Sequence, residues 1–347
     1  MKLKLNLFVC IFKKGFDLMD NIQQKNKITT YIQLFNELKD QMKWKITDNR
    51  LLMAMASLYV MNDKSLDTNH LLEIAENIKK RAKMFSAMRS QSRFSTAAFL
   101  DTNFDNPIEQ IENLYQYYHM FKQEKFQSGV FTYIAASIIV KNQDKEVDPR
   151  EIISKTKNIY QGMKKEHPFL TSTSDYPLAT LLAYEQHPDI VRKIEVFYDG
   201  LSKNGFKKGN DLQFISHILA LSRNETENTI ISRSMQIFDQ FKKIGIKPKS
   251  LYYPVIGMLA LLPQNILDMQ EIYEIYDKLN HEKYFKWQKD TNLIMAASFF
   301  AKDKLEHSHI AETSIYTTIE MIIQAQQAVM IAVIASISVS SSSNSSN

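Results

Sequence analysis

Apolar residues in the middle of the chain recur with the spacing of amphipathic helices. In segments 197–206, 237–246 and 275–284 an aromatic residue is followed three positions later by Leu or Phe, and five positions further by another large apolar residue. The first two of these residues share one helix face, and the third falls just past the helix end. Gly205 and Gly245 stand where a helix C-terminal cap is expected. The pattern predicts helices that each end in a short, glycine-assisted turn.

The same spacing recurs more loosely upstream, so the repeat is about 40 residues long. Tyr118 and Phe126 keep the spacing in one segment, and Tyr160 and Phe169 keep it with one extra residue in another. A period of this length is typical of two-helix solenoid repeats. The aromatic anchors of the five copies are Tyr118, Tyr160, Tyr198, Phe238 and Tyr276.

Each aromatic-first segment precedes a second segment in which small residues stand among large apolar ones. These second segments are residues 134–138, 178–183, 218–221, 256–260 and 295–299, and similar ones stand upstream at 54–58 and 95–99. Segments that are apolar on most sides predict buried helices, and their small residues allow close helix packing. About seven two-helix units would then span residues 31–300.

We therefore predict an all-α protein of helical hairpin repeats stacked as an α-solenoid, with a compact multi-helix bundle as the alternative. Glycine and proline, eight of each, are scarce enough to favour helices. Residues 1–24 are expected to be a poorly ordered or loosely docked extension, and residues 25–339 the repeat domain, including a terminal apolar helix at 310–339. Residues 340–347, all of them serine or asparagine, are expected to be a disordered tail.

The two ends of the chain each allow a second interpretation. Residues 1–16 begin like a signal peptide but lack a small-residue cleavage site, so we favour a non-exported extension. Residues 321–339 carry no charge and are long enough to span a membrane. Their glutamines and their continuity with a helical pattern favour a helix that caps the array or pairs with another chain, and a C-terminal membrane anchor is the weaker alternative. We expect a cytoplasmic protein without membrane contact, of unknown oligomeric state.

Composition narrows the chemistry available to the chain. A single cysteine, Cys10, excludes an internal disulfide and a Cys-based zinc site within one chain. The net charge of +5 over 347 residues is mild and indicates a solvated lysine-rich surface rather than a nucleic-acid-binding stripe. No pair of the eight histidines has metal-binding H-E-x-x-H spacing, and His217, in a buried-looking helix, is expected to be a core histidine with its hydrogen bonds satisfied.

The most distinctive loop runs from His167 to Pro177 and is dense in hydroxyl groups. It could contact a phosphate or a peptide. Ser174 or Asp175 as a helix cap, with Pro177 in the first turn, explains the same residues structurally, and we favour that interpretation. No general base stands beside the loop in the sequence to activate a Ser or Thr nucleophile.

Three acids, Asp199, Asp239 and Asp277, recur at equivalent positions of the repeat. A stripe of acids could bind a basic partner or a metal. A basic residue follows each acid by four positions, which instead favours ion pairs on the helix surface. These basic residues are Lys203, Lys243 and His281. The sequence therefore predicts no catalytic, cofactor-binding or metal-ligating residue, and no cofactor.

Segments His167–Ala183, Phe197–Phe206 and Met42–Asn62 resemble an uncharacterised bacterial family, domain of unknown function 4003. The resemblance covers about residues 25–335 and implies a bacterial, intracellular protein, but it carries no known activity and no functional residues to transfer. Met235–Pro248 is similar to pentatricopeptide-type repeats, whose solenoids read one RNA base per repeat. Its Gly-x-Lys-Pro ending occurs once, and the period here is longer than in that family.

The architecture favours an interaction or scaffold protein that binds a protein or peptide, although a fold does not by itself imply a function. RNA binding is the first alternative. An enzyme with a helix-lined pocket and no recognisable motif is the second, and its evidence would be a deep pocket with convergent titratable residues. The sequence does not decide whether the protein is an enzyme, and it favours a protein that is not one.

Overall fold

The computed structural model describes residues 26–143, 147–185, 187–223 and 225–307, together with Met330. Within these residues the regular structure is entirely helical, with thirteen α-helices labelled α2 to α14, one more over residues 26–42, and four short 3-10 helices. The prediction of an all-α protein is confirmed.

The helices alternate between an outer and an inner position. The outer helices are the one over residues 26–42, α3 (Thr68–Arg81), α5 (Gln110–Gln123), α7 (Pro149–Glu166), α9 (Ile190–Lys203), α11 (Glu227–Lys243) and α13 (Met269–His281). The inner helices are α2 (Asn49–Met61), α4 (Ser92–Asn103), α6 (Val130–Lys141), α8 (Tyr176–Ala183), α10 (Asn210–Ala220), α12 (Tyr253–Ala260) and α14 (Lys289–His307). The 3-10 helices are η1 (Ala87–Arg89), η2 (Thr173–Asp175), η3 (Ser250–Tyr252) and η4 (Gln264–Ile266).

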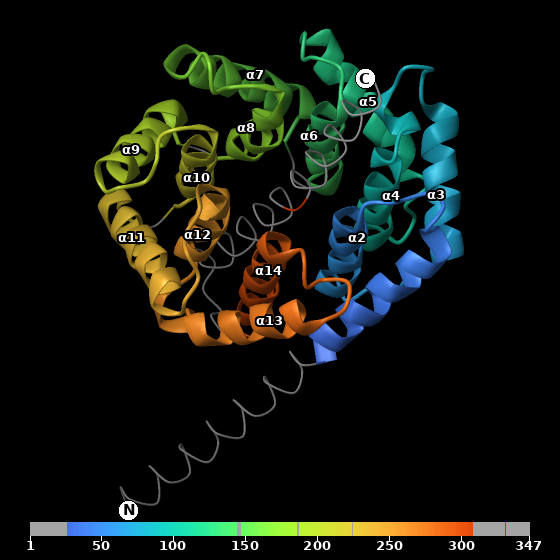
Figure 1. The fold of residues 1–347 in the computed structure, drawn as a ribbon. Coiled ribbons are helices and arrows are strands. Elements are labelled where there is room, and N and C mark those ends of the chain that lie inside the picture. Colours follow the sequence, from blue (N-terminus) through green and yellow to red (C-terminus); the bar gives the residue numbers. More distant parts are fainter. Residues whose placement is uncertain (1–25, 144–146, 186, 224, 308–329, 331–347) are drawn as a thin grey trace, which may run out of the picture.

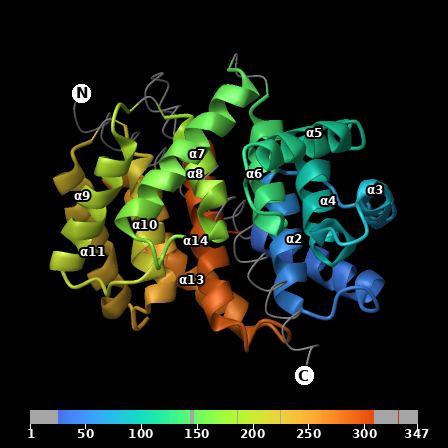
Figure 2. The ribbon, with the colours of Figure 1, turned by 90° about the horizontal axis from the view of Figure 1, so that it is seen from above.

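Seven helical hairpins follow one another around a closed ring, which Figure 1 shows along its axis and Figure 2 from the side. Neighbouring hairpins pack through their inner helices, and α14 of the last hairpin packs against α2 of the first. The described residues thus contain the seven units predicted from the repeat. The repeat array does not stay open as a superhelix, because its two ends meet.

An aromatic cluster joins the two ends of the ring. The ring centroid of Phe285 lies 4.6 Å from that of Phe35 and 5.5 Å from that of Tyr31. Phe299 on α14 packs edge-on against Tyr31 at 4.9 Å. Because all four side chains are buried, closure removes a large apolar area from water and stabilises the ring as one unit.

The inner helices are buried on nearly all sides, as their small residues predicted. Gly257 of α12 shows how closely they approach, since a Cβ atom placed there would lie 2.8 Å from Cγ1 of Ile215 on α10. Real Cβ contacts are longer than this, so the helix pair depends on glycine at this position. Glycine costs helix stability on its own, and close packing offsets that cost here.

Two outer helices, α9 and α11, end as the aromatic repeat predicted. Gly205 and Gly245 adopt positive φ angles of 92° and 81°, which favour glycine. The amides of Phe206 and Ile246 then donate to carbonyls five residues earlier, at 3.1 and 2.9 Å, which is the hydrogen bond of a Schellman cap. The Phe206 ring packs on the anchor of the next unit, Phe238, at 5.0 Å.

Two residues of the predicted repeat do not occupy this buried position. Phe169 is 98% exposed, and the ring of His167 packs instead on the next anchor, Tyr198, with centroids 4.2 Å apart. In the last unit Tyr284 is 37% exposed, and its neighbour Phe285 is buried. The alignment by spacing was wrong at these two loops because their backbones turn differently, which changes which residue faces the core.

The predicted N-terminal extension (1–24), most of the predicted terminal helix (310–339) and the serine-rich tail (340–347) lie outside the described residues. Met330 is the exception. It is buried, with its sulfur 3.2 Å from the hydroxyl of Ser57 on α2. Part of the C-terminal sequence therefore contacts an inner helix of the ring.

Candidate functional site

All seven loops that lead from an outer to an inner helix lie at one end of the ring, because every hairpin runs in the same direction. We call this end the loop rim. It consists of residues 43–48, 82–91, 124–129, 167–175, 204–209, 244–252 and 282–288. The inner helices begin at this rim, so their N-termini converge on one opening.

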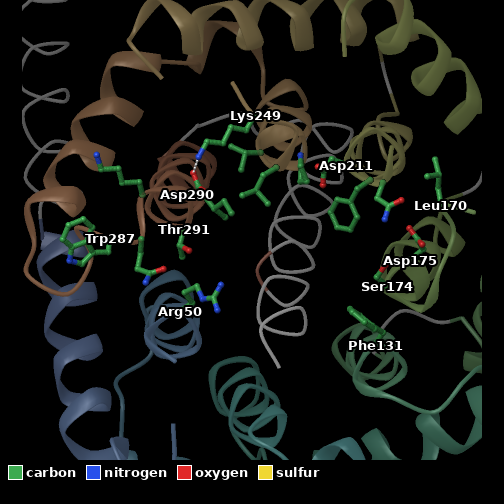
Figure 3. A pocket seen from close by; sticks show the side chains of 18 of the residues that line it. Arg50, Phe131, Leu170, Ser174, Asp175, Asp211, Lys249, Trp287, Asp290 and Thr291 are labelled. Atoms are coloured by element: carbon green, nitrogen blue, oxygen red, sulfur yellow. Dashed lines mark hydrogen bonds and ion pairs between the residues drawn. The ribbon is translucent and has the colours of Figure 1, made fainter. Parts of the chain in front are cut away.

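A cavity of about 630 Å³ lies in this opening (Figure 3), within the size range of small-molecule sites. It is lined by residues at the start of six inner helices or in the loops before them. They are Arg50, Phe131, Leu170, Ser174, Asp175, Asn210, Asp211, Phe214, Lys249, Leu251, Pro254, Val255, Lys286, Trp287, Gln288, Lys289, Asp290, Thr291 and Ile294. These residues are up to 244 positions apart in the chain, and only the closed ring brings them together.

The inner helices start at the rim mostly without a side-chain cap. The helix α2 is capped by Asp48, whereas α4, α6, α8, α10 and α12 have no side-chain acceptor at their N-cap position. Gly129 and Gly209 occupy that position in α6 and α10 and have no side chain to offer. The first turns of α6 and α10 therefore leave backbone N–H donors and a positive dipole end directed at the opening, an arrangement that binds anions. By contrast, α8 and α12 continue directly from η2 and η3, and the amides of Tyr176 and Tyr253 donate to carbonyls of those 3-10 helices.

The outer helices, which start at the opposite end of the ring, show the contrary pattern. Five of them, α3, α7, α9, α11 and α13, are capped by an Asp or Thr side chain. The caps are Asp67, Asp148, Asp189, Thr226 and Asp268. The outer helix α5 has no such cap. Side-chain caps are thus more frequent at the end of the ring away from the cavity, and the glycine starts of α6 and α10 lie at the cavity end.

Cations gather on the α2–α14 side of the cavity, as Figure 3 shows for Arg50 and Lys249. Lys249 donates to Asp290 at 2.7 Å, and Arg50 forms an ion pair with Asp48 at 2.7 Å. Lys286 lies over the Trp287 ring, 5.3 Å from a centroid. Neither Lys286 nor Lys289 has an ion pair within the part of the chain that the structure describes, so both charges are available to a ligand.

Acids and hydroxyls gather on the opposite side, at the start of α8 and α10, where Figure 3 shows Ser174, Asp175 and Asp211. Asp175 is buried and accepts a hydrogen bond from the amide of Ser172 at 2.8 Å. Burial raises the pKa of the Asp175 carboxyl to about 6. A carboxyl with this pKa can exchange a proton near neutral pH, which is the property of a general acid or base.

His217 lies behind Asp175, with Nδ1 3.6 Å from a carboxyl oxygen, and is fully buried. Burial lowers the pKa of the imidazole to about 3, and the nearby His167 lowers it further. Its placement in the core is as predicted. The prediction that its hydrogen bonds are satisfied is wrong, because neither ring nitrogen has a hydrogen-bond partner within the described residues.

The loop His167–Pro177 has the structural role that the sequence favoured, with a different cap. Ser172 is the capping residue, in a capping box with Asp175 around η2, and Pro177 lies in the first turn of α8. Ser174 and Asp175 also line the cavity, so the same loop serves both the helix start and the candidate site.

The repeated acids lie on outer helices, away from the cavity. Asp277 is 3.5 Å from His281, as the spacing predicted. Asp239 pairs with Lys242 at 2.8 Å, one residue before the predicted partner, and Asp199 has no ion pair within the described residues. The acids do not form a shared site, and no group of three or more potential metal ligands occurs in the described part of the chain.

Sequence reasoning missed the residues that line the cavity. Arg50, Asp211 and Asp290 each stand in the first turn of an inner helix, and Trp287 stands just before one. Charged residues at the start of otherwise apolar helices were visible in the sequence, and they are the signal that could have marked the rim. Without the closed ring, nothing indicated that these helix starts meet.

The comparison with known proteins agrees with the resemblance found in the sequence. Residues 34–328 match a family model described as "Protein of unknown function (DUF4003)". The chain belongs to the DUF4003 family. It is 33% identical over 332 residues to "Uncharacterized protein YeaA" of Bacillus subtilis (strain 168), which covers 95% of this chain and all of that protein. No solved structure matches the chain.

Neither the family description nor the relative's name states an activity, so membership of DUF4003 transfers no function to this chain. Among the described residues, no helix combines the length and the apolar character that crossing a bilayer requires. Residues 321–339, apart from Met330, lie outside the described part of this DUF4003 protein.

Proposed function

We propose that this protein binds a small organic anion in the mouth of its helical ring. The observation that supports this most is the convergence of inner-helix starts, with α6 and α10 uncapped, on a cavity that also holds the unpaired Lys286 and Lys289. Backbone donors, the helix dipoles and the lysine charges all favour a carboxylate or a phosphate at the same place. Apolar side chains such as Phe131 and Phe214 line the cavity between the charged groups and fit the carbon skeleton of an organic ligand.

The two sides of the cavity also constrain the rest of the ligand. An anionic group on the α2–α14 side leaves its other end near Ser174, Asp175 and Asp211. Carboxylates accept hydrogen bonds, so a hydroxyl or an amino group fits there. A phosphorylated polyol or an amino acid derivative has this combination of groups.

Ring closure limits the surfaces on which a scaffold protein of this shape could bind a protein or peptide partner. The inner helices face one another across the ring and do not form the open concave surface along which extended solenoids bind partners. A protein or peptide partner would therefore contact a rim or the outer helices. The cavity is the feature with converging charged groups, and for that reason we place ligand binding first.

Trp287 provides a direct test, because the chain has only two tryptophans and the other, Trp44, does not line the cavity. In a Trp44→Phe background, Trp287 fluorescence is followed while inorganic phosphate, glycerol phosphate or citrate is added at constant ionic strength. We expect a saturable change for at least one of them. Adding Lys289→Glu should weaken its affinity at least about tenfold.

Lys203→Glu is the matched control, since Lys203 is an exposed lysine at the end of α9 and does not line the cavity. It should leave the titration unchanged. The proposal is wrong if none of the three anions gives a saturable response up to about 10 mM, a range that covers weak millimolar binding. Equal losses in both lysine variants would also contradict it, because they would indicate a non-specific effect of net charge.

A further inference from the structure

The loop rim carries the most exposed apolar side chains of the molecule. Among the described residues, five large apolar side chains are more than 70% exposed, and all five lie on this rim. They are Trp44 (90%), Met84 (74%), Phe85 (97%), Phe169 (98%) and Trp287 (80%). At the opposite end of the ring the exposed large apolar residues are Ile108 and Val147, at 39% and 38%. Apolar side chains concentrated on one face in this way mark an interaction surface.

The same rim is strongly basic. Its seven loops contain eleven Lys or Arg and four Asp or Glu residues. Three of these acids are already engaged, Asp48 with Arg50, Glu124 with Lys157, and Asp175 by burial. The loops at the opposite end reverse the balance, with nine acids and two basic residues among those described. The ring therefore has one basic, apolar end and one acidic end.

Lysine and apolar residues alternate at the tips of these loops. Trp44 stands between Lys43 and Lys45, with the Lys43 ammonium 5.9 Å from its ring centroid. Lys83 precedes Met84 and Phe85 in the second loop. Tryptophan and phenylalanine beside lysine are the side chains that enter the headgroup region of a bilayer, where the ring meets acyl chains and the ammonium meets lipid phosphates.

We propose that the loop rim docks the protein on an anionic membrane surface. The tips surround the whole opening of a closed ring, so a broad lipid surface can contact all of them at once. Docking of this kind needs no membrane-spanning helix, and it is independent of which anion the cavity binds.

Two features favour lipid over nucleic acid as the partner of this rim. Ten of its eleven basic residues are lysine, whose ammonium is a point charge suited to a diffuse anionic surface. One is arginine, whose planar guanidinium can make paired hydrogen bonds to phosphates and base edges. Met84 and Leu251 are also exposed on the rim, and neither can stack on a base. Aliphatic side chains gain from burial among acyl chains.

The test uses co-sedimentation of the full chain with vesicles of phosphatidylcholine alone and of phosphatidylcholine with 30% phosphatidylglycerol. We expect binding to the anionic vesicles only. A Trp44→Ser/Phe85→Ser/Phe169→Ser variant should lose at least about tenfold in affinity. The three side chains are exposed and none lines the cavity, so the variant should fold, which circular dichroism checks, and should keep its anion response through Trp287.

Ile108→Ser/Val196→Ser is the matched control, because both residues are exposed but lie away from the rim, and it should bind like the parent protein. In a Trp287→Phe variant the remaining Trp44 should be quenched by brominated lipids in anionic vesicles. Absence of anionic-vesicle binding, equal binding by the rim variant, or salt-sensitive binding to an RNA oligonucleotide without vesicle binding would overturn the proposal.

Discussion

At the scale of single residues, the Asp175–His217 pair is the least ordinary feature of the core. Two ionisable groups lie 3.6 Å apart, and burial opposes the charged form of each. The carboxyl pKa is raised and the imidazole pKa is lowered, so the two groups respond to acid in opposite ways. Their effects on stability can therefore be separated by pH.

The signs follow from linkage. Below about pH 6 folded Asp175 holds a proton that the unfolded chain releases down to about pH 4, so its contribution to stability is present at low pH and is lost as pH rises through that window. In the unfolded chain His217 is protonated below about pH 6.5, whereas in the folded chain it stays neutral down to about pH 3. Its contribution to stability is therefore present above pH 6.5 and is lost on acidification.

We predict opposite changes in two single variants. In His217→Gln only Asp175 of the pair titrates, and in Asp175→Asn only His217 does. As pH falls from 6.5 to 4.5, the free energy of unfolding of His217→Gln should therefore rise relative to that of Asp175→Asn. The difference in unfolding free energy between the two variants should change by a few kcal/mol over this range. Urea denaturation at three pH values measures this difference, and all other titrating groups are common to both variants. Parallel slopes would contradict the assigned pKa directions.

At the scale of elements, the ring depends on how closely its inner helices pack. The helices α10 and α12 meet at Gly257, where a Cβ would lie 2.8 Å from Cγ1 of Ile215. An Ala in place of a Gly usually stabilises a helix by up to about 1 kcal/mol. Here the close contact with the Ile215 side chain should reverse the sign of that effect.

Gly257→Ala is expected to lower the free energy of unfolding by about 1–3 kcal/mol, the usual cost of overpacking. Ile215→Ala removes the atom that the new Cβ would meet. The double variant should therefore lose less stability than the sum of the two single variants, which a double-mutant cycle by urea denaturation measures. Strict additivity would show that the two helices do not touch at this point.

Most of this element-scale structure was predictable, because its causes are local. The aromatic spacing identified the outer helices, and Gly205 and Gly245 indicated their caps, since only the backbone within one turn decides a positive φ. The exposed Phe169 was misassigned because loop geometry, not spacing, decides which residue of a loop faces the core. The same limit applied to the cap at Ser172.

At the scale of the whole molecule, the causes are non-local. Phe35 and Phe285 meet across 250 positions of sequence, and Arg50 and Asp290 share a cavity across 240. No local pattern carries information about such pairs, so the sequence predicted the repeat units but neither the ring nor its cavity. The charge difference between the loop rim and the opposite end of the ring depends on which end each loop occupies, and the sequence alone does not give that information.

Phe285 is expected to hold the ring closed. Phe285→Ala should lower the free energy of unfolding by about 3–5 kcal/mol, because it leaves a cavity in the aromatic seam. Hydrogen exchange should rise first in the helix over residues 26–42 and in α13 and α14. Phe169→Ala, the same substitution at a fully exposed site, should change stability by less than about 0.5 kcal/mol. Similar losses in both variants would show that the seam has no special role.

Both proposals depend on the closed ring, because only closure gathers the helix starts and the loop tips at one end. The most direct test is the distance between spin labels in an Asp40→Cys/Lys283→Cys variant with Cys10→Ser. Tyr284 lies 4.8 Å from the Lys39 ammonium, so these positions face each other across the seam. Double electron–electron resonance should show one distance below about 30 Å, since one label lies on the helix over residues 26–42 and the other in the adjacent loop 282–288. A distance on the order of 60 Å, expected for seven hairpins stacked in an open array at helix-packing spacing, would contradict the closed ring.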